Sequence, residues 1–129
     1  MVNIPIFKTN IMNNFRELKV WNNGITLVKQ VYTTTKKYPK EELFGLTNQM
    51  RRCAISIPSN IAEGAGRKSN NEFEHFLYIA LGSCFELETQ LIISKELEFI
   101  TSDKFDNLQK EIVEVEKMIR GLQKKLDNK

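Results

Sequence analysis

The residues with the clearest potential for chemistry lie between Gly64 and Ser69. This short segment contains two glycines, a basic pair and a hydroxyl side chain. This order is similar to a phosphate-binding loop, in which a glycine stands directly before the lysine and the loop follows a strand. The chain has Arg67 directly before Lys68, and no strand-like alternation precedes it. The spacing therefore excludes a nucleotide-binding loop of this type. A helix start beside Arg67 and Lys68 could still hold an anion, although Glu72 competes for the same helix end.

Neither a metal site nor a nucleophilic enzyme is predicted. His75 is the only histidine, and it lacks the second histidine or paired cysteines that a zinc site needs. Cys53 and Cys84 lie at apolar helical positions without the clustered spacing of a disulfide framework, so reduced and buried thiols are expected. None of the serines has an evident neighbouring base. We therefore expect no catalytic residue, no metal and no cofactor.

Asn60, Glu63 and Glu86, together with Arg51 and Arg52, form a concentrated polar set in otherwise apolar helical segments. If the second and third helices are antiparallel neighbours, Arg51 or Arg52 can approach Glu86 across the helix pair. A polar network that fixes helix register or a subunit contact is the favoured interpretation, and a catalytic site is the alternative.

Charge is distributed unevenly along the chain. Residues 29–68 hold eight basic and three acidic side chains, whereas residues 72–98 hold one basic and six acidic side chains. These segments could pair with each other, or they could leave a basic face free for phosphates. The residues predicted to contact nucleic acid are basic side chains of the first segment and of the last helix: Lys36, Lys37, Lys40, Arg51, Arg52, Arg67, Lys68, Lys124 and Lys125.

Two apolar stripes run along the helical segment that precedes Pro39. The first repeats at spacings of three and four, is predicted to face the core, and consists of Phe15, Leu18, Trp21, Ile25, Val28 and Tyr32. The second lies close to the opposite side, and self-association is the simplest way to bury it. The predicted oligomer interface therefore consists of Val20, Leu27, Val31 and, on the next helix, Ile55.

Three further helices follow. Pro39 and two acidic residues are expected to open the second helix, whose apolar stripe continues through Pro58. A kink is expected there, because proline lacks a donor and crowds the preceding turn. Ser69 and Glu72 have the spacing of a capping box at the start of the third helix. Residues 105–126 carry apolar positions at alternating spacings of three and four, which is typical of a helix in a bundle.

These patterns predict an all-α, up-down-up-down antiparallel four-helix bundle, with the second helix kinked near Pro58. Residues 1–13 contain a proline and no sustained period, so they are expected to be a loosely ordered lead-in, and residues 14–129 a single domain. The N-terminus has no signal-peptide pattern, and no run approaches the ~18 apolar residues of a membrane span. We therefore expect a soluble, cytoplasmic protein without a membrane partner.

Several short motifs match a known family. They are Phe15-x-x-Leu18-x-Val20-Trp21, Tyr38-Pro39-x-Glu41-x-x-x-Gly45-Leu46, Gln49-x-Arg51-Arg52, Ser56-Ile57-Pro58-x-Asn60-Ile61-Ala62-Glu63-Gly64 and Ala80-x-Gly82-Ser83-x-x-Glu86. In this order the chain resembles the bacterial four-helix bundle proteins known as 23S rRNA intervening-sequence proteins. The resemblance covers about residues 15–100. Its most specific part is Asn-Ile-Ala-Glu-Gly, and the last helix contributes only its pattern.

The resemblance carries expectations about assembly and partners. Members of the family are encoded within insertions in 23S rRNA genes or elsewhere in bacterial genomes, and they generally lack an assigned enzymatic activity. A related group serves as accessory proteins to the reverse transcriptase of diversity-generating retroelements and forms a pentameric barrel whose basic surface engages nucleic acid. For this chain, the resemblance implies a homo-oligomer, expected to be a pentamer, with RNA or DNA as a partner.

The predicted function is therefore a non-enzymatic, homo-oligomeric bundle that binds nucleic acid, RNA in particular, through contacts to its backbone. The alternative is a structural or adaptor protein whose partner is another protein. The two hypotheses differ in whether the basic residues are exposed or paired with acidic residues. Exposed and clustered lysines and arginines favour nucleic acid, whereas pairing with the glutamates of the third helix favours the adaptor.

Overall fold

The computed structural model describes residues 14–127, and this part of the chain consists of helices without any strand. The long helices are α2 (Lys19–Thr35), α3 (Leu46–Ala65), α4 (Asn70–Glu96) and α5 (Ser102–Asp127), and the short 3-10 helices are η1 (Phe15–Glu17) and η2 (Lys40–Glu42). The prediction of an all-α four-helix bundle is confirmed. The predicted lead-in, residues 1–13, lies outside the described residues.

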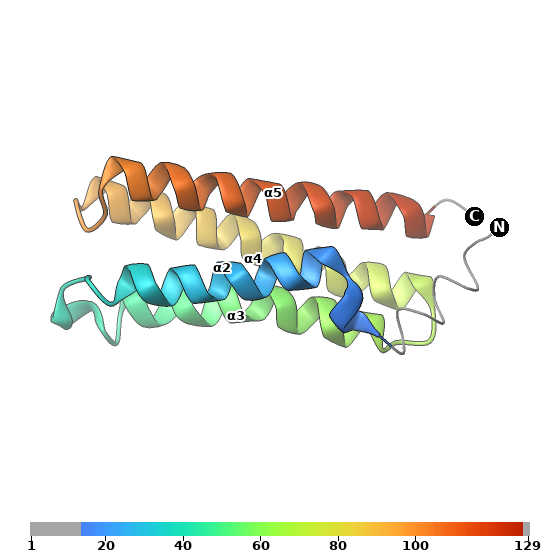
Figure 1. The fold of residues 1–129 in the computed structure, drawn as a ribbon. Helices are drawn as coiled ribbons and strands as arrows, with labels where there is room; N and C mark the ends of the chain where they lie inside the picture. The colour runs from blue at the N-terminus through green and yellow to red at the C-terminus, as the bar shows by residue number, and fades with distance from the viewer. Residues whose placement is uncertain (1–13, 128–129) are drawn as a thin grey trace.

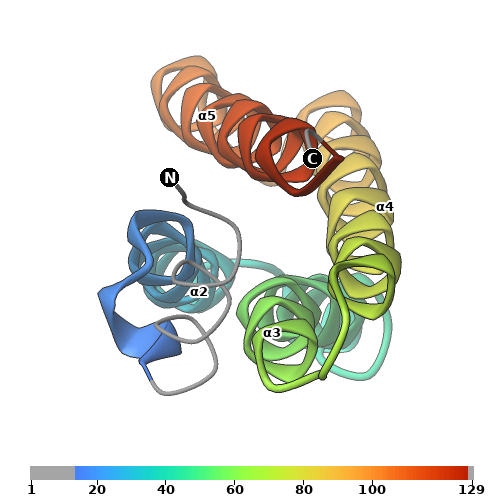
Figure 2. The same ribbon diagram turned by 90° about the vertical axis from the view of Figure 1, so that its right-hand side faces the viewer.

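Consecutive helices run in opposite directions along a common axis, as the colours in Figure 1 show. Viewed down that axis, α2 and α4 lie on opposite sides of the bundle (Figure 2). The most extensive packing joins α3 to α4, and α2 packs less extensively on α5 than α4 does. The bundle is therefore built around the α3–α4 pair.

The face that α2 turns toward the core is not the predicted one. Val20, Leu27 and Val31 are almost fully buried within this single chain, so the prediction that they form an oligomer interface is wrong. The predicted core stripe of α2 is only partly buried, and Ile25 and Tyr32 are each 37% exposed. Ile55, the fourth predicted interface residue, is exposed on α3.

Gly24 explains why α2 buries the other of its two apolar faces. A Cβ atom added at Gly24 would lie 3.3 Å from Pro58 Cβ, so α2 and α3 approach each other closely at this point. Gly24 occupies the same side of α2 as Val20, Leu27 and Val31. A glycine in the stripe lowers its apparent apolarity but allows the close packing that buries it.

The start of α3 differs from its prediction, whereas the start of α4 agrees. Instead of opening α3, the residues after Pro39 form η2, and α3 begins at Leu46. The helix continues through Pro58 to Ala65, and the kink remains a prediction. The Ser69 hydroxyl accepts a hydrogen bond from the Glu72 backbone N–H at 3.1 Å, so Ser69 is the N-cap of α4.

Gly64 serves close packing, and none of the described glycines has a positive φ. A Cβ atom at Gly64 would lie 2.7 Å from Phe76 Cβ and 2.9 Å from Phe73 Cδ1. The absence of a side chain therefore lets α3 and α4 meet at their shared turn.

The sequence has no uninterrupted run of ~18 apolar residues, but one described helix, α4, meets the length and composition of a membrane span. By length and composition alone, α4 qualifies, with a mean hydropathy of 1.4 over an 18-residue window. Of that window, 44% is buried inside the bundle. A helix that packs against both α3 and α5 needs apolar residues on two sides, which accounts for part of this composition.

Candidate functional site

The nine basic residues predicted to bind nucleic acid fall at two opposite ends of the bundle (Figure 1). The first group lies where α2 passes through η2 into α3, here called the α2–α3 end, and consists of Lys36, Lys37, Lys40, Arg51 and Arg52. The second lies at the turn between α3 and α4 and in the last turn of α5, here called the α3–α4 end, and consists of Arg67, Lys68, Lys124 and Lys125. One bundle cannot present all nine on one continuous patch.

Arg51 is engaged within the protein. Its Nε donates a hydrogen bond to Thr35 Oγ1 at 2.9 Å, and its guanidinium lies 4.6 Å from the centre of the Tyr32 ring. Thr35 Oγ1 in turn donates to the Val31 carbonyl at 2.7 Å. Arg51 therefore ties α3 to the end of α2 and is less available for a ligand than a free arginine.

Arg67 is likewise paired. Its Nη2 lies 2.6 Å from Glu63 Oε2, and its guanidinium lies 4.8 Å from the centre of the Phe76 ring. Both charged side chains are about half exposed, so this ion pair adds little stability, but it neutralises the charge locally. The α3–α4 end is therefore less basic than its sequence indicates.

The predicted polar network of Asn60, Glu63 and Glu86 is not one network. Asn60 Nδ2 donates to the Ser56 carbonyl at 2.8 Å and to Ser56 Oγ at 3.0 Å. Ser56 Oγ lies 2.8 Å from Ser83 Oγ and links α3 to α4. Glu63 pairs with Arg67 instead, and Glu86 lies further along α4 in a groove. The three residues are separated because they occupy different turns of two antiparallel helices.

Four cations at the α2–α3 end remain free. Within residues 14–127, the side chains of Lys36, Lys37, Lys40 and Arg52 are exposed and make no hydrogen bond or ion pair. The nearby Glu42 is occupied, because its Oε1 accepts the Leu46 backbone N–H at 3.3 Å. A hydrogen bond leaves the negative charge of Glu42 in place, and Glu41 is exposed, so the five basic and two acidic side chains of residues 36–52 give this segment a net charge of +3.

An exposed aromatic ring lines the same groove as Arg52 and was not predicted from the sequence. Phe44 is 90% exposed, between η2 and the start of α3. The available signal was its position: it falls off the stripe that joins Leu43, Leu46 and Met50, so it could not face the core together with them.

Phe44 forms one wall of a groove of ≈ 450 Å³ between α3 and α4. Its lining comes from the start of α3 and the middle of α4: Phe44, Asn48, Gln49, Arg52, Cys53, Ser56, Ser83 and Glu86. The deeper groups are satisfied, since Cys53 Sγ donates to the Ser83 carbonyl at 3.1 Å and the two serines pair with each other. The rim residues keep free polar groups.

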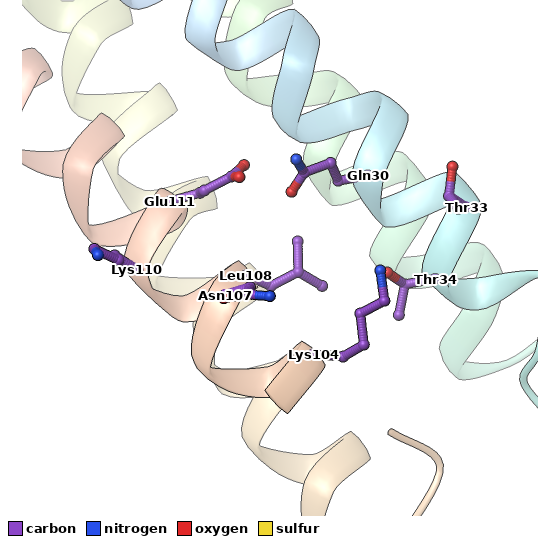
Figure 3. A pocket seen from close by; sticks show the side chains of 8 residues that line it. All are labelled: Gln30, Thr33, Thr34, Lys104, Asn107, Leu108, Lys110 and Glu111. Atoms are coloured by element: carbon purple, nitrogen blue, oxygen red, sulfur yellow. The ribbon is translucent and has the colours of Figure 1, made fainter. Parts of the chain in front are cut away.

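A second pocket, of ≈ 290 Å³, lies between α2 and α5. Gln30 and Glu111 point toward each other across it, and Lys104 reaches from α5 toward Thr34 (Figure 3). Leu108 supplies an apolar floor. The pocket reflects the looser packing of α2 on α5, and its polar lining suits water or a small polar molecule.

Both cysteines are buried thiols. Burial and the neighbouring Glu86 carboxylate raise the pKa of Cys53 to about 12, and burial and Glu116 raise the pKa of Cys84 to about 12. Thiols with such pKa values are poor nucleophiles. Among residues 14–127, no group of three or more histidine, cysteine, aspartate or glutamate side chains is placed to hold a metal ion.

Two carboxyl groups meet between α4 and α5. Burial, together with hydrogen bonding and charge repulsion from Glu88, raises the pKa of Glu116 to about 7, although Arg120 acts in the opposite direction. Glu116 Oε2 is buried and finds no donor when both groups are ionised. On the other side, Glu88 Oε2 accepts from Gln109 Nε2 at 3.4 Å. A proton held by Glu116 therefore allows it to donate to Glu88.

This carboxyl pair should make stability depend on pH. Because the folded pKa of Glu116 lies above its ordinary value of 4.5, stability is full below that value and is lost as pH rises through about 7. Glu116→Gln removes the charge and keeps a donor, so we expect it to stabilise the fold by about 1 kcal/mol at pH 8, a value reduced by solvent screening. Urea unfolding at pH 5 and pH 8 measures the difference.

The exposed Glu114 on the same helix provides the matched control. Glu114→Gln should leave the pH dependence unchanged, whereas Glu116→Gln should flatten it. Equal pH profiles for the wild type and Glu116→Gln would show that the two carboxyl groups do not share a proton.

Comparison with known proteins agrees with the motifs in the first three helices. The family model described as 23S rRNA-intervening sequence protein matches residues 16–121. The chain belongs to this family. The match includes most of α5, for which the sequence offered a pattern but no motif. Membership of the family of 23S rRNA-intervening sequence proteins is thus established for most of the bundle.

A solved structure shares the fold. It is the crystal structure of a protein with unknown function from the S23 ribosomal protein family of Bacteroides thetaiotaomicron, with a TM-score of 0.76 and 24% sequence identity. The alignment covers 81% of this chain and 95% of that chain. At this identity the similarity shows the bundle alone. No curated protein matches the chain significantly.

Proposed function

We propose that this protein is a non-enzymatic, homo-oligomeric bundle that binds RNA through the α2–α3 end. The observation that carries the proposal is the group of four exposed, unpaired cations in residues 36–52, one of which, Arg52, shares a groove with an exposed aromatic ring. Unpaired lysines and arginines release counterions when they contact phosphates, and this release supplies most of the affinity for a nucleic acid backbone. The membership in the 23S rRNA-intervening sequence family supports RNA as the nucleic acid.

The acidic residues limit where the strand can lie. Glu96 is the last residue of α4 and Glu98 lies in the turn that follows, and this α4–α5 turn is at the same end of the bundle as the basic group (Figure 1). Phosphates would be repelled from that turn and attracted to the side formed by η2 and α3. The strand is therefore expected to follow η2 and the first turns of α3.

Self-association has support from two separate apolar faces. One lies on α2 and α3 and includes Ile25, Tyr32 and Ile55, each more than a third exposed. The other lies on α4, across the bundle from α2 (Figure 2), and consists of Tyr78, Ile79, Phe85, Ile92 and Ile93. Two different faces fit a head-to-tail contact, and such a contact forms a ring when the rotation between successive copies closes. The pentamer expected from the related retroelement accessory proteins is such a ring.

A protein partner is the second candidate, and the α4 face favours it. Tyr78 is 63% exposed and Phe85 43% exposed, and apolar side chains along one helix are typical of a protein contact. If a second copy of this chain covers the α4 face, the adaptor hypothesis loses its support. In either case we propose a cytoplasmic protein without a cofactor and without a membrane partner.

Fluorescence anisotropy of a labelled single-stranded RNA tests the proposed function. We expect binding at low salt that weakens steeply as salt is raised. A protein that does not bind RNA at low salt, or whose binding is indifferent to salt, would contradict the proposal. Light scattering of the same sample should give a multiple of the 15.0 kDa chain mass.

A further inference from the structure

We infer that the groove between the start of α3 and the middle of α4 holds an unpaired RNA base, with Phe44 as the platform on which the base stacks. The inference rests on the proposed RNA binding and adds to it a site for a base rather than a phosphate. It follows from the exposure of Phe44, from the free polar groups on the groove rim, and from the negative charge of Glu86.

Phe44 is held in place although its ring is exposed. The turn that carries it is fixed by backbone hydrogen bonds from Leu43 N–H to the Lys40 carbonyl at 3.1 Å and from Gly45 N–H to the Glu42 carbonyl at 3.0 Å. The Glu42 carboxylate also caps the first turn of α3. A ring on a fixed turn loses little freedom when a base stacks on it, and every base has a face that can stack.

The groove rim offers groups that hydrogen-bond to base edges. The side chains of Asn48 and Gln49 are exposed and have no partner within the described chain, and Arg52 is equally free. Amide side chains pair with the donor and acceptor groups of bases, and a guanidinium can stack on a base or contact the adjoining phosphate. These three residues lie on the first turns of the helix that Phe44 precedes.

The charge of Glu86 favours a base over a phosphate as the group bound in the groove. Its carboxylate lines the groove opposite α3 and lies near enough to Cys53 to raise the pKa of that thiol. A carboxylate repels phosphate but accepts a hydrogen bond from the amino group of cytosine. The phosphates of the same strand would lie instead against Lys36, Lys37 and Lys40, which share this end of the bundle. The groove thus suits an amino-bearing base.

The test compares a single-stranded RNA with an abasic strand of equal length and charge, in the wild type and in Phe44→Ala. We expect the wild type to bind the base-bearing strand about tenfold more tightly than the abasic strand, and Phe44→Ala to bind both equally. Leu43→Ala, at the neighbouring exposed residue, is the matched control and should keep the preference. Oligocytidine should bind more tightly than oligouridine, and Glu86→Ala should remove that difference.

Each other outcome has a definite meaning. Equal, salt-dependent binding of both strands by the wild type would leave the proposed RNA binding intact and overturn the base site. No binding of either strand would overturn both. A change in the molar mass of Phe44→Ala by light scattering would make Phe44 a subunit contact and overturn its assignment as a stacking platform.

Discussion

Replacing Lys36, Lys37, Lys40 and Arg52 together by glutamine should weaken the affinity for single-stranded RNA by about 10²–10³-fold at ~0.1 M salt. Each phosphate contact on a single strand releases ~0.7 counterion, which corresponds to roughly a fivefold change in affinity at this salt. Four lost contacts multiply to the stated loss. Because all four side chains are exposed and unpaired, the fold should be unaffected, and anisotropy titration of a labelled RNA measures the loss.

The matched control changes the other end of the bundle. Lys68, Lys124 and Lys125 are also exposed, and their joint replacement by glutamine should change the affinity by less than about threefold. A large loss in this control, together with a small loss in the first variant, would place the RNA at the α3–α4 end.

Leu27→Ala should cost about 2–5 kcal/mol of the free energy of unfolding, because Leu27 is fully buried on α2, which packs on α3 and α5, and a cavity would remain. Ile25→Ala, two positions away but 37% exposed, should cost less than about 1 kcal/mol. Urea unfolding of both variants at one protein concentration measures the contrast.

The same pair of variants separates core from interface. Ile25→Ala should lower the molar mass of the assembly or make it depend on protein concentration, because Ile25 belongs to the proposed apolar contact face on α2 and α3. Equal stability losses for the two variants would contradict the assignment of Val20, Leu27 and Val31 to the core.

The sequence was sufficient where one apolar stripe was dominant. Along α5, Phe105, Leu108, Ile112 and Val115 are buried as their spacing predicts. Ser69 is the N-cap of α4, since local hydrogen bonding alone determines such a cap. Local patterns of this kind need no information about the neighbouring helix.

The sequence was insufficient where packing against a neighbouring helix determines which residues are buried. The two stripes of α2 are similarly apolar, and the choice between them depends on the contact of Gly24 with Pro58, 34 residues further along the chain. Gly64 is a similar case, because its role comes from Phe73 and Phe76 across the turn. A glycine that permits close packing gives no signal until the neighbour is known.

The candidate site was predictable in composition but not in arrangement. The basic residues were identified from charge alone, but the bundle places them at two opposite ends. Arg51 and Arg67 each contact an aromatic ring and a polar or acidic side chain. Phe44 was missed because it belongs to no apolar stripe, and only the conformation of the turn before α3 shows that its ring is exposed.

The salt dependence of RNA binding by the wild-type assembly is the most direct test of the central claim that the α2–α3 end binds an RNA backbone. With four contacts per site, the logarithm of the association constant should fall against the logarithm of salt concentration with a slope of about −3. The variant lacking the four cations should have a slope close to zero. A wild-type slope near zero, or no binding at ~0.05 M salt, would contradict the account.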